Sequence, residues 1–591
     1  MRKKMEMPVV AHSKFWVLLL CALIATGCGG GGGGGGGSSV VDDGSGGGII
    51  VVDDGAGGNG DTDGEDGEDE QGSGGSGGDD DEATPPIPVR EVFQLLEQAS
   101  FGPTEDDVLQ VRELGIEGWI DAQLQQPASL QLPFLQTFPE DSDSADLQAD
   151  RVDIWYRNVL QGDDQLRQRV AFALSQIMVV SQQSVLVNGV YALADYYDML
   201  AENAFGNYRD LIEDVTLHPA MGVYLSMLGN ERPDPDRNIR PDENYARELM
   251  QLFSIGLVEL NLDGSQVLDG AGQPIPTYDQ SIIEGFSHVY TGWNWAGAAN
   301  FRAARPGIEN QSQPMQLYPP FHDTGEKKLL SGVVLPAGQS GEEDLAAALD
   351  NVFNHPNVGP FMAIRLIQRL VTSNPSPAYV ARVASVFNND GTGVRGNLAA
   401  VVKAILLDQE ARSLAPSETG GKLKEPILRV TQLWRAFDAQ SASGRYPLVT
   451  SFLLFGQGPL QSPSVFNFFS PFYAPAGDIR DAGLVAPELQ IASEYQNTVF
   501  TNLMFLQSFA LTQASDSLRQ DDIYIDISEE MALAEDVDAL VQSVALKLLG
   551  GEISATLRNE LTGMLEILPT EFRASEAVYI IVSSPEFAYQ R

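Results

Sequence analysis

The chain has 591 residues, a formal net charge of −45 and two cysteines, Cys21 and Cys28. So negative a surface repels phosphate backbones, which argues against nucleic acid as a partner. Because both cysteines precede residue 29, the rest of the chain excludes thiol catalysis, cysteine metal sites and a disulfide framework.

Residues 1–28 are typical of a bacterial lipoprotein signal peptide. A basic start precedes an apolar run from Phe15 to Ile24, which is too short to span a bilayer. The segment Ala25-Thr26-Gly27-Cys28 resembles a lipobox, so we predict lipidation of Cys28 and a stable membrane anchor. Gly29 stands where Asp is the usual inner-membrane retention signal, which points to the outer membrane. The alternative is an ordinary secretory signal that leaves a soluble protein.

Residues 29–87 have the composition of a disordered linker. A polyglycine run is followed by Gly/Asp/Glu repeats, and no aromatic residue, Lys or Arg occurs as far as Thr84. Such a segment cannot bury enough apolar surface to offset its chain entropy, so we predict an acidic spacer. An EF-hand calcium loop is not predicted, because Asp66 occupies the sixth position from Asp61, where that loop needs glycine.

Residues 88–591 form the predicted globular domain, which is long enough for two or three cores packed as one unit. Apolar residues recur at helical spacing in many windows. The predicted helices include Gln165 to Val180, Leu345 to Phe353, Phe361 to Val371, Tyr379 to Phe387 and Asn397 to Leu407. Lys328 to Leu335 is predicted as a small β-hairpin and Gly264 to Pro276 as a loop insertion. The predicted fold class is therefore mainly α with a minor β element.

The segment from Asp242 to Ile255 is predicted as one helix, capped at its first residue and stopped by Gly256. At about 100° per residue, Glu248 falls within the apolar arc of this helix. A carboxylate there needs a partner, a cation or a raised pKa. Glu248 is therefore a candidate general base or metal ligand. The alternative is a buried ion pair with Arg365 or Arg369.

A second helix is predicted to begin at Thr277, with Gln280 completing a capping box. Glu284 and His288 lie four residues apart on its polar face. This spacing can chelate a metal ion and is equally typical of a solvated pair. We expect the solvated pair.

His322 and Asp323 follow two prolines in a loop that contains glycine. Loops that hold a His and an Asp are common places for catalysis or cation binding, and this pair is the strongest candidate in the chain. The alternative is that Asp323 caps a turn and His322 bonds a local carbonyl group. His218 and His355 each precede proline, and we expect them to cap or pack at helix starts.

Standard enzyme signatures are missing from the body of the chain. It contains no HExxH helix motif and no Walker lysine, and G-x-S-x-G spacing occurs within the linker alone. Gly391 to Gly396 matches G-x-G-x-x-G but follows a predicted helix rather than a strand. We therefore predict a helix-to-helix turn there.

Several sequence blocks resemble the DUF-eighteen-hundred family of exported bacterial proteins. In chain order they are Leu95 to Thr104, Asn244 to Phe253, Thr291 to Trp293, Phe321 to Lys327, His355-Pro356, Pro463 to Phe469 and Ser584 to Phe587. Together they span nearly the whole body. Asp242 stands where the family commonly has Asn, and His288 where it often has Arg, so the resemblance supports no role for His288.

The resemblance carries over no activity, cofactor or catalytic residue, but it implies export and a sulfatase-like partner in the envelope. One hypothesis is a binding or assembly factor at the cell surface or in the periplasm. Its predicted binding residues are Asn244, Arg247 and Lys327. An exposed aromatic patch would favour it, and the candidates are Phe466, Phe468, Phe469, Phe472 and Tyr473.

The alternative hypothesis is a metal-assisted hydrolase that acts on extracellular or envelope material. Its predicted catalytic residues are Glu248, His322 and Asp323, with a divalent cation as cofactor. These groups must converge in one pocket, because they have to reach one reacting atom. The sequence leaves open whether the protein is an enzyme.

Overall fold

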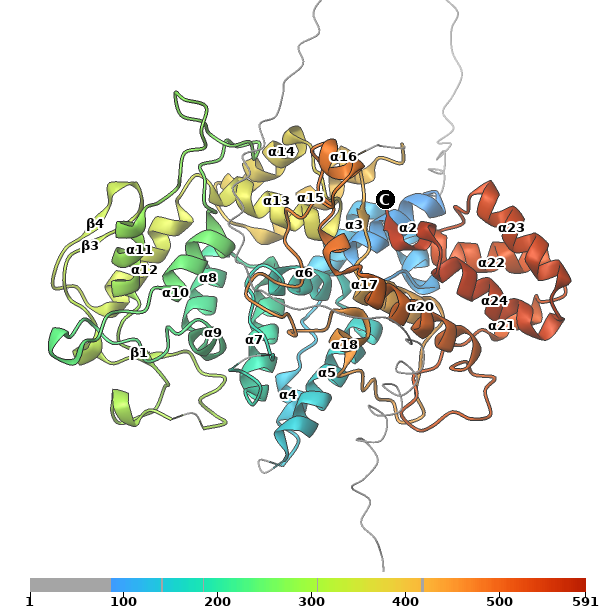
Figure 1. Cartoon of the computed structure of the whole chain (residues 1–591), viewed down its shortest axis with the longest axis horizontal. Coiled ribbons are helices and arrows are strands. Elements are labelled where there is room, and N and C mark those ends of the chain that lie inside the picture. The colour runs from blue at the N-terminus through green and yellow to red at the C-terminus, as the bar shows by residue number, and fades with distance from the viewer. Residues whose placement is uncertain (1–86, 140–141, 184, 306, 416–418) are drawn as a thin grey trace, which may run out of the picture. The chain divides into compact units, whose positions relative to one another are not determined.

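Helices dominate the part of the chain that the computed structural model describes, which comprises residues 87–139, 142–183, 185–305, 307–415 and 419–591 (Figure 1). These residues belong to one unit that runs from Gly77 to Arg591. The predicted signal peptide, the predicted lipidation site Cys28 and residues 29–86 of the predicted linker 29–87 lie outside the described residues.

The first group of helices contains an aromatic centre in which Phe101, Trp155 and Phe172 have ring centroids 5.5–5.9 Å apart. Aromatic contacts at this distance add to the free energy of burial. The helices are α2 (Val89–Ala99), α3 (Glu105–Leu124), α4 (Leu132–Leu135), α5 (Ser144–Gln161), α6 (Gln165–Ser175), α7 (Val190–Glu202), α8 (Tyr208–Leu217) and α9 (Pro219–Tyr224).

The middle of the chain adds a second group of helices, several of which begin at a side-chain cap. Ser340 and Glu343 form a capping box at one of them, and Asn397 caps another. These helices are α10 (Asn244–Glu248), α11 (Gln280–Val289), α12 (Gly341–Phe353), α13 (Val358–Leu370), α14 (Pro377–Asn388), α15 (Leu398–Leu407), α16 (Gln409–Arg412) and α17 (Pro426–Ala436).

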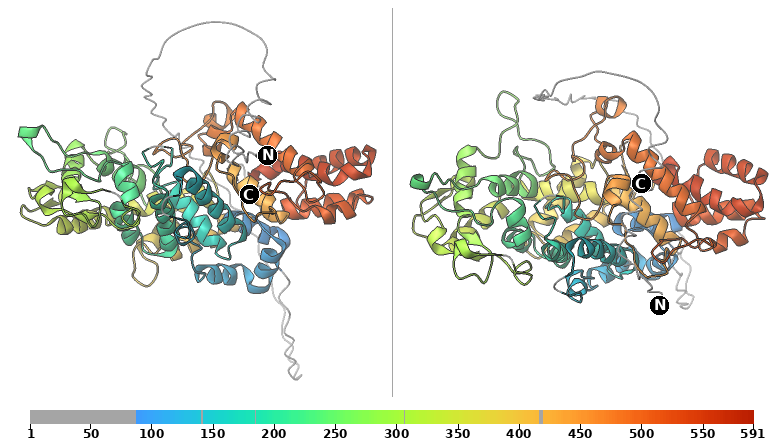
Figure 2. Two further views of the ribbon diagram at one scale, coloured as in Figure 1. Left: turned by 90° about the horizontal axis from the view of Figure 1, so that it is seen from below. Right: turned by 60° about the horizontal axis from the view of Figure 1, so that its bottom comes forward.

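The last group is α18 (Ser451–Phe455), α19 (Asp478–Asp481), α20 (Glu494–Phe509), α21 (Ser528–Ala532), α22 (Val537–Leu549), α23 (Ala555–Ile567), α24 (Thr570–Val582) and α25 (Pro585–Ala588). Figures 1 and 2 show α21–α24 together at one end of this unit and α10–α12 at the other, with α6 and α17 between them. Most buried apolar side chains form one cluster that joins all three groups, and a small second cluster lies between α4, α5 and α7. No described helix combines the length and the apolar character needed to cross a membrane.

Three short antiparallel pairs of strands complete the described fold. β1 (Trp293–Asn294) pairs with β2 (Gln316–Leu317), and β3 (Lys327–Lys328) pairs with β4 (Val334–Leu335). β5 (Lys422–Leu423) pairs with β6 (Tyr589–Gln590) and so joins two distant parts of the chain. The mainly helical class with a minor β element is confirmed, and β3–β4 is the predicted hairpin.

The predicted helices of the middle region are confirmed with small shifts of their ends, and Gly391 to Gly396 forms the predicted turn between α14 and α15. The helix predicted over residues 165–180 was wrong in extent. Gln165 to Val180 is helical only as far as Ser175, and the remaining apolar residues are buried in irregular backbone. Burial makes such a run apolar whether or not it is helical, so hydrophobic pattern alone cannot find the end.

The predicted helix from Asp242 to Ile255 changes its hydrogen bonding half-way. α10 ends at Glu248 and continues as a π-helix, η3 (Leu249–Ser254), before Gly256 turns the chain with a φ of 74°. A π-helix widens each turn, so the angle of 100° per residue no longer applies after Glu248. The next helix, α11, starts at Gln280 with Asp279 as its cap, not at Thr277, whose hydroxyl donates to the carbonyl of Gly256 instead.

Candidate functional site

The predicted His-Asp loop lies where α11, α12 and β3 meet. α11 approaches β3 so closely that a Cβ added to Gly285 would lie 1.9 Å from the carbonyl oxygen of Lys328. After α11, the hydroxyl of Thr291 donates to the carbonyl of His288 at 2.7 Å and accepts the N–H of Asp323 at 2.9 Å. These contacts fix the loop against the end of the helix.

His322 is fully enclosed at the base of this loop, with 1% of its surface exposed. Its Nδ1 lies 2.9 Å from the carbonyl oxygen of Thr291, and its Nε2 lies 3.0 Å from Oδ2 of Asp344. Both ring nitrogens are therefore occupied by internal acceptors. The bond to the Thr291 carbonyl agrees with the structural alternative for His322, and the bond to Asp344 was not expected.

Lys327 is equally buried, although the sequence suggests a binding residue. Its Nζ lies 2.6 Å from Oδ2 of Asp344 and donates to the carbonyl oxygens of Asp323, at 2.6 Å, and Gly325, at 2.9 Å. An ammonium group has three N–H donors, so these contacts use all of them. In this conformation Lys327 holds the loop and has no donor left for a ligand.

Asp323 pairs with His288, through a close contact between its Oδ2 and Nδ1 of the ring. The other carboxylate oxygen accepts the N–H of Gly325 at 2.8 Å. The hydrogen bond from His288 lowers the pKa of Asp323 to about 2, against the smaller opposing effect of burial. The His288 side chain is 31% exposed, and no described residue hydrogen bonds its Nε2. The expected partner on the same helix, Glu284, is not involved.

Glu248 occupies different surroundings. It is 7% exposed, and its Oε2 is buried without a hydrogen-bond partner among the described residues. Burial raises the pKa of Glu248, and neighbouring Arg247 opposes this effect. The buried Tyr278 hydroxyl near this carboxylate also has no described partner, and burial raises the pKa of Tyr278 to about 12.

Neither of the expected partners of Glu248 contacts it. The guanidinium of Arg365 lies 4.5 Å from the ring centroid of Phe472, and that of Arg369 lies 4.5 Å from the centroid of Phe469. Within the described part of the chain, no hydrogen bond or ion pair joins Glu248 to the residues of the His-Asp loop. Glu248 therefore lies outside the hydrogen-bond network that contains His322 and Asp323, the other two predicted catalytic residues.

The other two predicted binding residues lie on α10, and both side chains reach the protein surface. Asn244 is exposed, and its N–H is capped by the side chain of Asp242 at 2.8 Å. Arg247 pairs with Glu243 at 3.0 Å, in a solvent-exposed contact. Both side chains remain accessible, unlike Lys327.

His218 and His355, the other two histidines in the described part of the chain, lie at the starts of helices. Nδ1 of His218 accepts the N–H of Ala220 at the start of α9, and Nδ1 of His355 accepts the N–H of Asn357 before α13. Burial, helped by nearby Arg395, lowers the pKa of His355 to about 4. Across the residues described, no cluster of three or more His, Cys, Asp or Glu side chains is arranged to hold a metal ion.

The predicted aromatic patch is only partly exposed. Phe466 and Phe472 are 58% and 67% exposed, whereas Phe468 and Phe469 are buried. Phe472 covers the guanidinium of Arg365 and therefore has an internal contact of its own.

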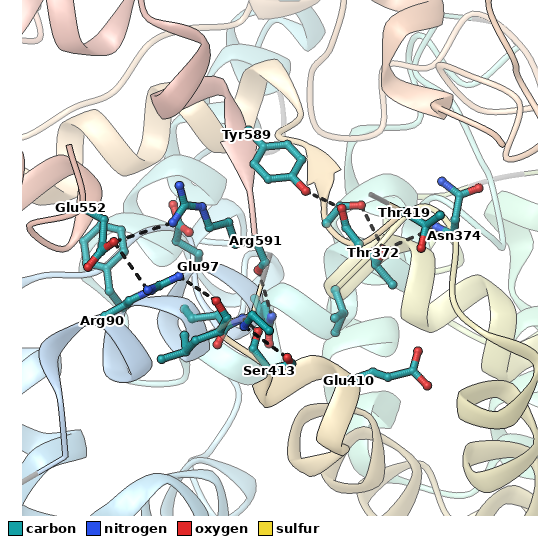
Figure 3. Close-up of a pocket in the computed structure, with 18 of the residues that line it drawn as sticks. Arg90, Glu97, Thr372, Asn374, Glu410, Ser413, Thr419, Glu552, Tyr589 and Arg591 are labelled. Atoms are coloured by element: carbon teal, nitrogen blue, oxygen red, sulfur yellow. Dashed lines mark hydrogen bonds and ion pairs between the residues drawn. The ribbon is translucent and has the colours of Figure 1, made fainter. Parts of the chain in front are cut away.

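A cavity of about 480 Å³ lies elsewhere, beside α2 (Figure 3). One face of α2 lines it, together with the segment after α16, the residues before β5, and β6. Figure 3 shows Arg90, Glu552 and Arg591 side by side in its wall, with Tyr589 and Asn374 further along. Pockets of 300–1,000 Å³ are the usual size for small-molecule sites.

Three charged groups in this cavity are loosely paired. Oε2 of Glu552 lies 3.6 Å from Arg90 and 3.9 Å from Arg591, distances too long for direct hydrogen bonds. The carboxylate of Glu552 makes no hydrogen bond to any described residue, and 45% of this side chain is exposed. Gln94 adds a buried Oε1 without a partner in the described residues.

No local sequence pattern predicts this cavity, because its walls come from segments that are distant in the chain. Gln98 of α2 donates to the backbone carbonyls of Ala411 and Arg591, and β6 hydrogen bonds to β5. A periodic pattern within α2 identifies a buried face but not what lies opposite it. Asp344 was missed for a related reason, since nothing distinguishes it from the neighbouring Glu342 and Glu343 in the first turn of α12.

Comparison with known proteins gives a family but no activity. The family model described as "Protein of unknown function (DUF1800)" matches residues 94–589, from α2 to β6. No curated protein and no solved structure matches the chain. The family match covers most of the sequence, and the chain therefore belongs to the DUF1800 family.

Proposed function

We propose that the protein is an exported, lipid-anchored binding factor of the cell envelope, and that its ligand occupies the cavity beside α2. The loosely paired Arg90, Glu552 and Arg591 carry this proposal. Charged groups in a cavity that are separated by more than hydrogen-bond distance keep donors and acceptors that a ligand or a bridging water can use.

The His-Asp loop supports the same conclusion by contrast. Both ring nitrogens of His322 and all three donors of Lys327 contact internal acceptors. Opening these contacts for a substrate would leave buried charges without partners, which costs several kcal/mol. A binding site therefore fits the cavity better than the loop.

The location of the protein is part of the proposal. The lipobox-like segment ending at Cys28 and the absence of Asp at position 29 support an outer-membrane lipoprotein. We further propose that the protein acts beside a sulfatase-like envelope partner, as the family resemblance implies. Replacement of Cys28 by Ser is expected to move the protein from the membrane fraction to the soluble fraction. Retention of the variant in the membrane would contradict the lipid anchor.

Native mass spectrometry of the full chain, extracted from its own envelope in mild detergent, tests the binding function. We expect a bound small molecule in the parent protein, reduced at least about tenfold in a Glu552→Ala variant. Glu560→Ala is the matched control, because Glu560 is exposed on α23 and does not line the cavity. The proposal fails if no added mass appears, or if it persists in Glu552→Ala.

A second candidate function is hydrolysis of envelope or extracellular material, supported by the His288–Asp323 pair. A carboxylate that holds Nδ1 of a histidine leaves Nε2 to act as a general base. In this case His288→Gln abolishes release of soluble products from an envelope extract, whereas His218→Gln does not. Equal release by parent and His288→Gln proteins would remove this candidate.

A further inference from the structure

We infer that the ligand of the α2 cavity is a neutral, polyhydroxylated molecule of one or two sugar rings. This inference rests on the proposed binding function and specifies the chemistry of its ligand. The evidence comes from the order of polar groups along α2, from the balance of charge in the cavity and from the rings in its wall.

One face of α2 presents planar polar side chains in succession. Arg90, Gln94 and Gln98 are spaced by four residues, and Glu97 lies beside them on the same face. At about 1.5 Å per residue the series covers roughly 12 Å along the helix axis. Gln98 is buried and its amide is fully bonded within the protein. The guanidinium of Arg90 gives one N–H to the carbonyl of Leu414 and keeps other donors, and Oε1 of Gln94 is an acceptor without a partner among the described residues. Hydroxyl groups suit such a wall, because each one both donates and accepts.

Most charges in the cavity are already compensated by neighbouring residues. Glu97 accepts from Lys424 at 2.8 Å, and Glu410 pairs with Arg382 at 3.1 Å. Glu552 is shared between the two arginines at the other end of the cavity. No single sign of charge dominates, so a strongly anionic or cationic ligand gains little from this wall. A neutral ligand with many hydrogen-bonding groups fits the arrangement.

The cavity wall also contains aromatic and apolar side chains. The ring of Tyr589 is held in place because its hydroxyl bonds the backbone carbonyl of Gly420, and 40% of this residue is exposed. Phe93 and Leu549 add apolar surface. Sugar rings combine hydroxyl edges with C–H faces, and the C–H faces pack on aromatic side chains. The wall provides surfaces of both kinds.

Isothermal titration calorimetry of the full chain tests the ligand class. The neutral probes are maltose, cellobiose and the N-acetylglucosamine dimer. The charged probes are glucuronate, glucosamine and glutamate. We expect at least one neutral probe to bind and no charged probe to match it. Glu552→Ala should weaken that binding about tenfold or more, whereas Glu552→Gln, whose amide still accepts a hydrogen bond, should keep it within about threefold.

The control variant is again Glu560→Ala, which should bind like the parent protein. If a charged probe binds in a Glu552-dependent way and no neutral probe does, the ligand class is wrong but the cavity remains a binding site. If no probe binds and mass spectrometry also shows no cavity-dependent ligand, the inference and the proposed function both fail. Binding of a neutral probe that Glu552→Ala leaves unchanged places the sugar elsewhere and overturns the inference.

Discussion

The His-Asp loop and the α2 cavity differ in how their polar groups are satisfied. In the loop, His322, Lys327 and Asp344 are almost completely buried and bonded to one another. In the cavity, the charged groups of Arg90 and Arg591 are partly exposed and lie beyond hydrogen-bond distance of the partly exposed Glu552 carboxylate. Residue types that are typical of catalysis thus form buried contacts that hold the loop to α12. Residues without a recognisable sequence motif line the open cavity.

The largest expected effect tests whether the loop is structural. Asp344→Ala leaves the charge of Lys327 buried without its carboxylate partner and removes the acceptor at Nε2 of His322, which should lower the free energy of unfolding by about 3–5 kcal/mol. Urea denaturation at pH 7 measures this loss. Glu342→Ala, an exposed position in the same helix turn, is the control and should change stability by less than about 0.5 kcal/mol. A loss below about 1 kcal/mol for Asp344→Ala would show that the contacts of Asp344 with His322 and Lys327 do not stabilise the fold.

The His288–Asp323 pair should make a smaller contribution that depends on pH. Because the pKa of Asp323 falls from 3.8 to about 2 on folding, the unfolded chain binds more protons between these values. The stabilisation is present above about pH 4 and is lost as the pH falls toward 2. Partial exposure of the pair limits it to about 1 kcal/mol.

Thermal unfolding of the parent and Asp323→Asn proteins between pH 3 and 7 measures this contribution. The difference in melting temperature should be largest near neutral pH and should narrow below pH 4. A constant difference across the range would exclude ionisation of Asp323 as its cause.

Glu248 should respond with the opposite sign. Its pKa is raised by burial, so the folded state holds the ionised carboxylate less favourably than the unfolded chain does. Stability therefore declines as the pH rises above the ordinary glutamate pKa of 4.5. Glu248→Gln should raise the free energy of unfolding at pH 7 by on the order of 1 kcal/mol, and the gain should vanish below about pH 4. Destabilisation at pH 7 would mean that the carboxylate has a favourable partner.

The smallest effect on stability is expected in the cavity. Glu552→Ala removes a carboxylate with no hydrogen bond to a described residue, so the free energy of unfolding should change by less than about 0.5 kcal/mol. The same variant is expected to lose ligand, which separates binding from folding. A large loss of stability would make Glu552 a structural residue like Asp344.

The sequence predicted the helices well and the contacts between them poorly. Apolar periodicity depends on residues three and four apart, and it located α12 to α15 and the turn between α14 and α15. The partner of His322 is 22 residues away, and Arg90 meets Glu552 across more than four hundred residues. Contacts between residues so far apart produce no periodic pattern in the sequence. The change from α- to π-helix after Glu248 was missed because the pattern assumes one angle per residue throughout.

The pairing of β5 with β6 has a consequence for how the protein matures. Tyr589 forms part of the cavity wall, whereas Arg90 and Gln94 stand on the first described helix. Synthesis proceeds from the N-terminal side, so α2 is made long before the strand that faces it. Joining segments so far apart in sequence is a slow step of folding. The cavity is therefore completed late, because the wall that β6 provides is added only after residues 589–590 have been made. Occupancy of the cavity would then report that the domain has folded completely.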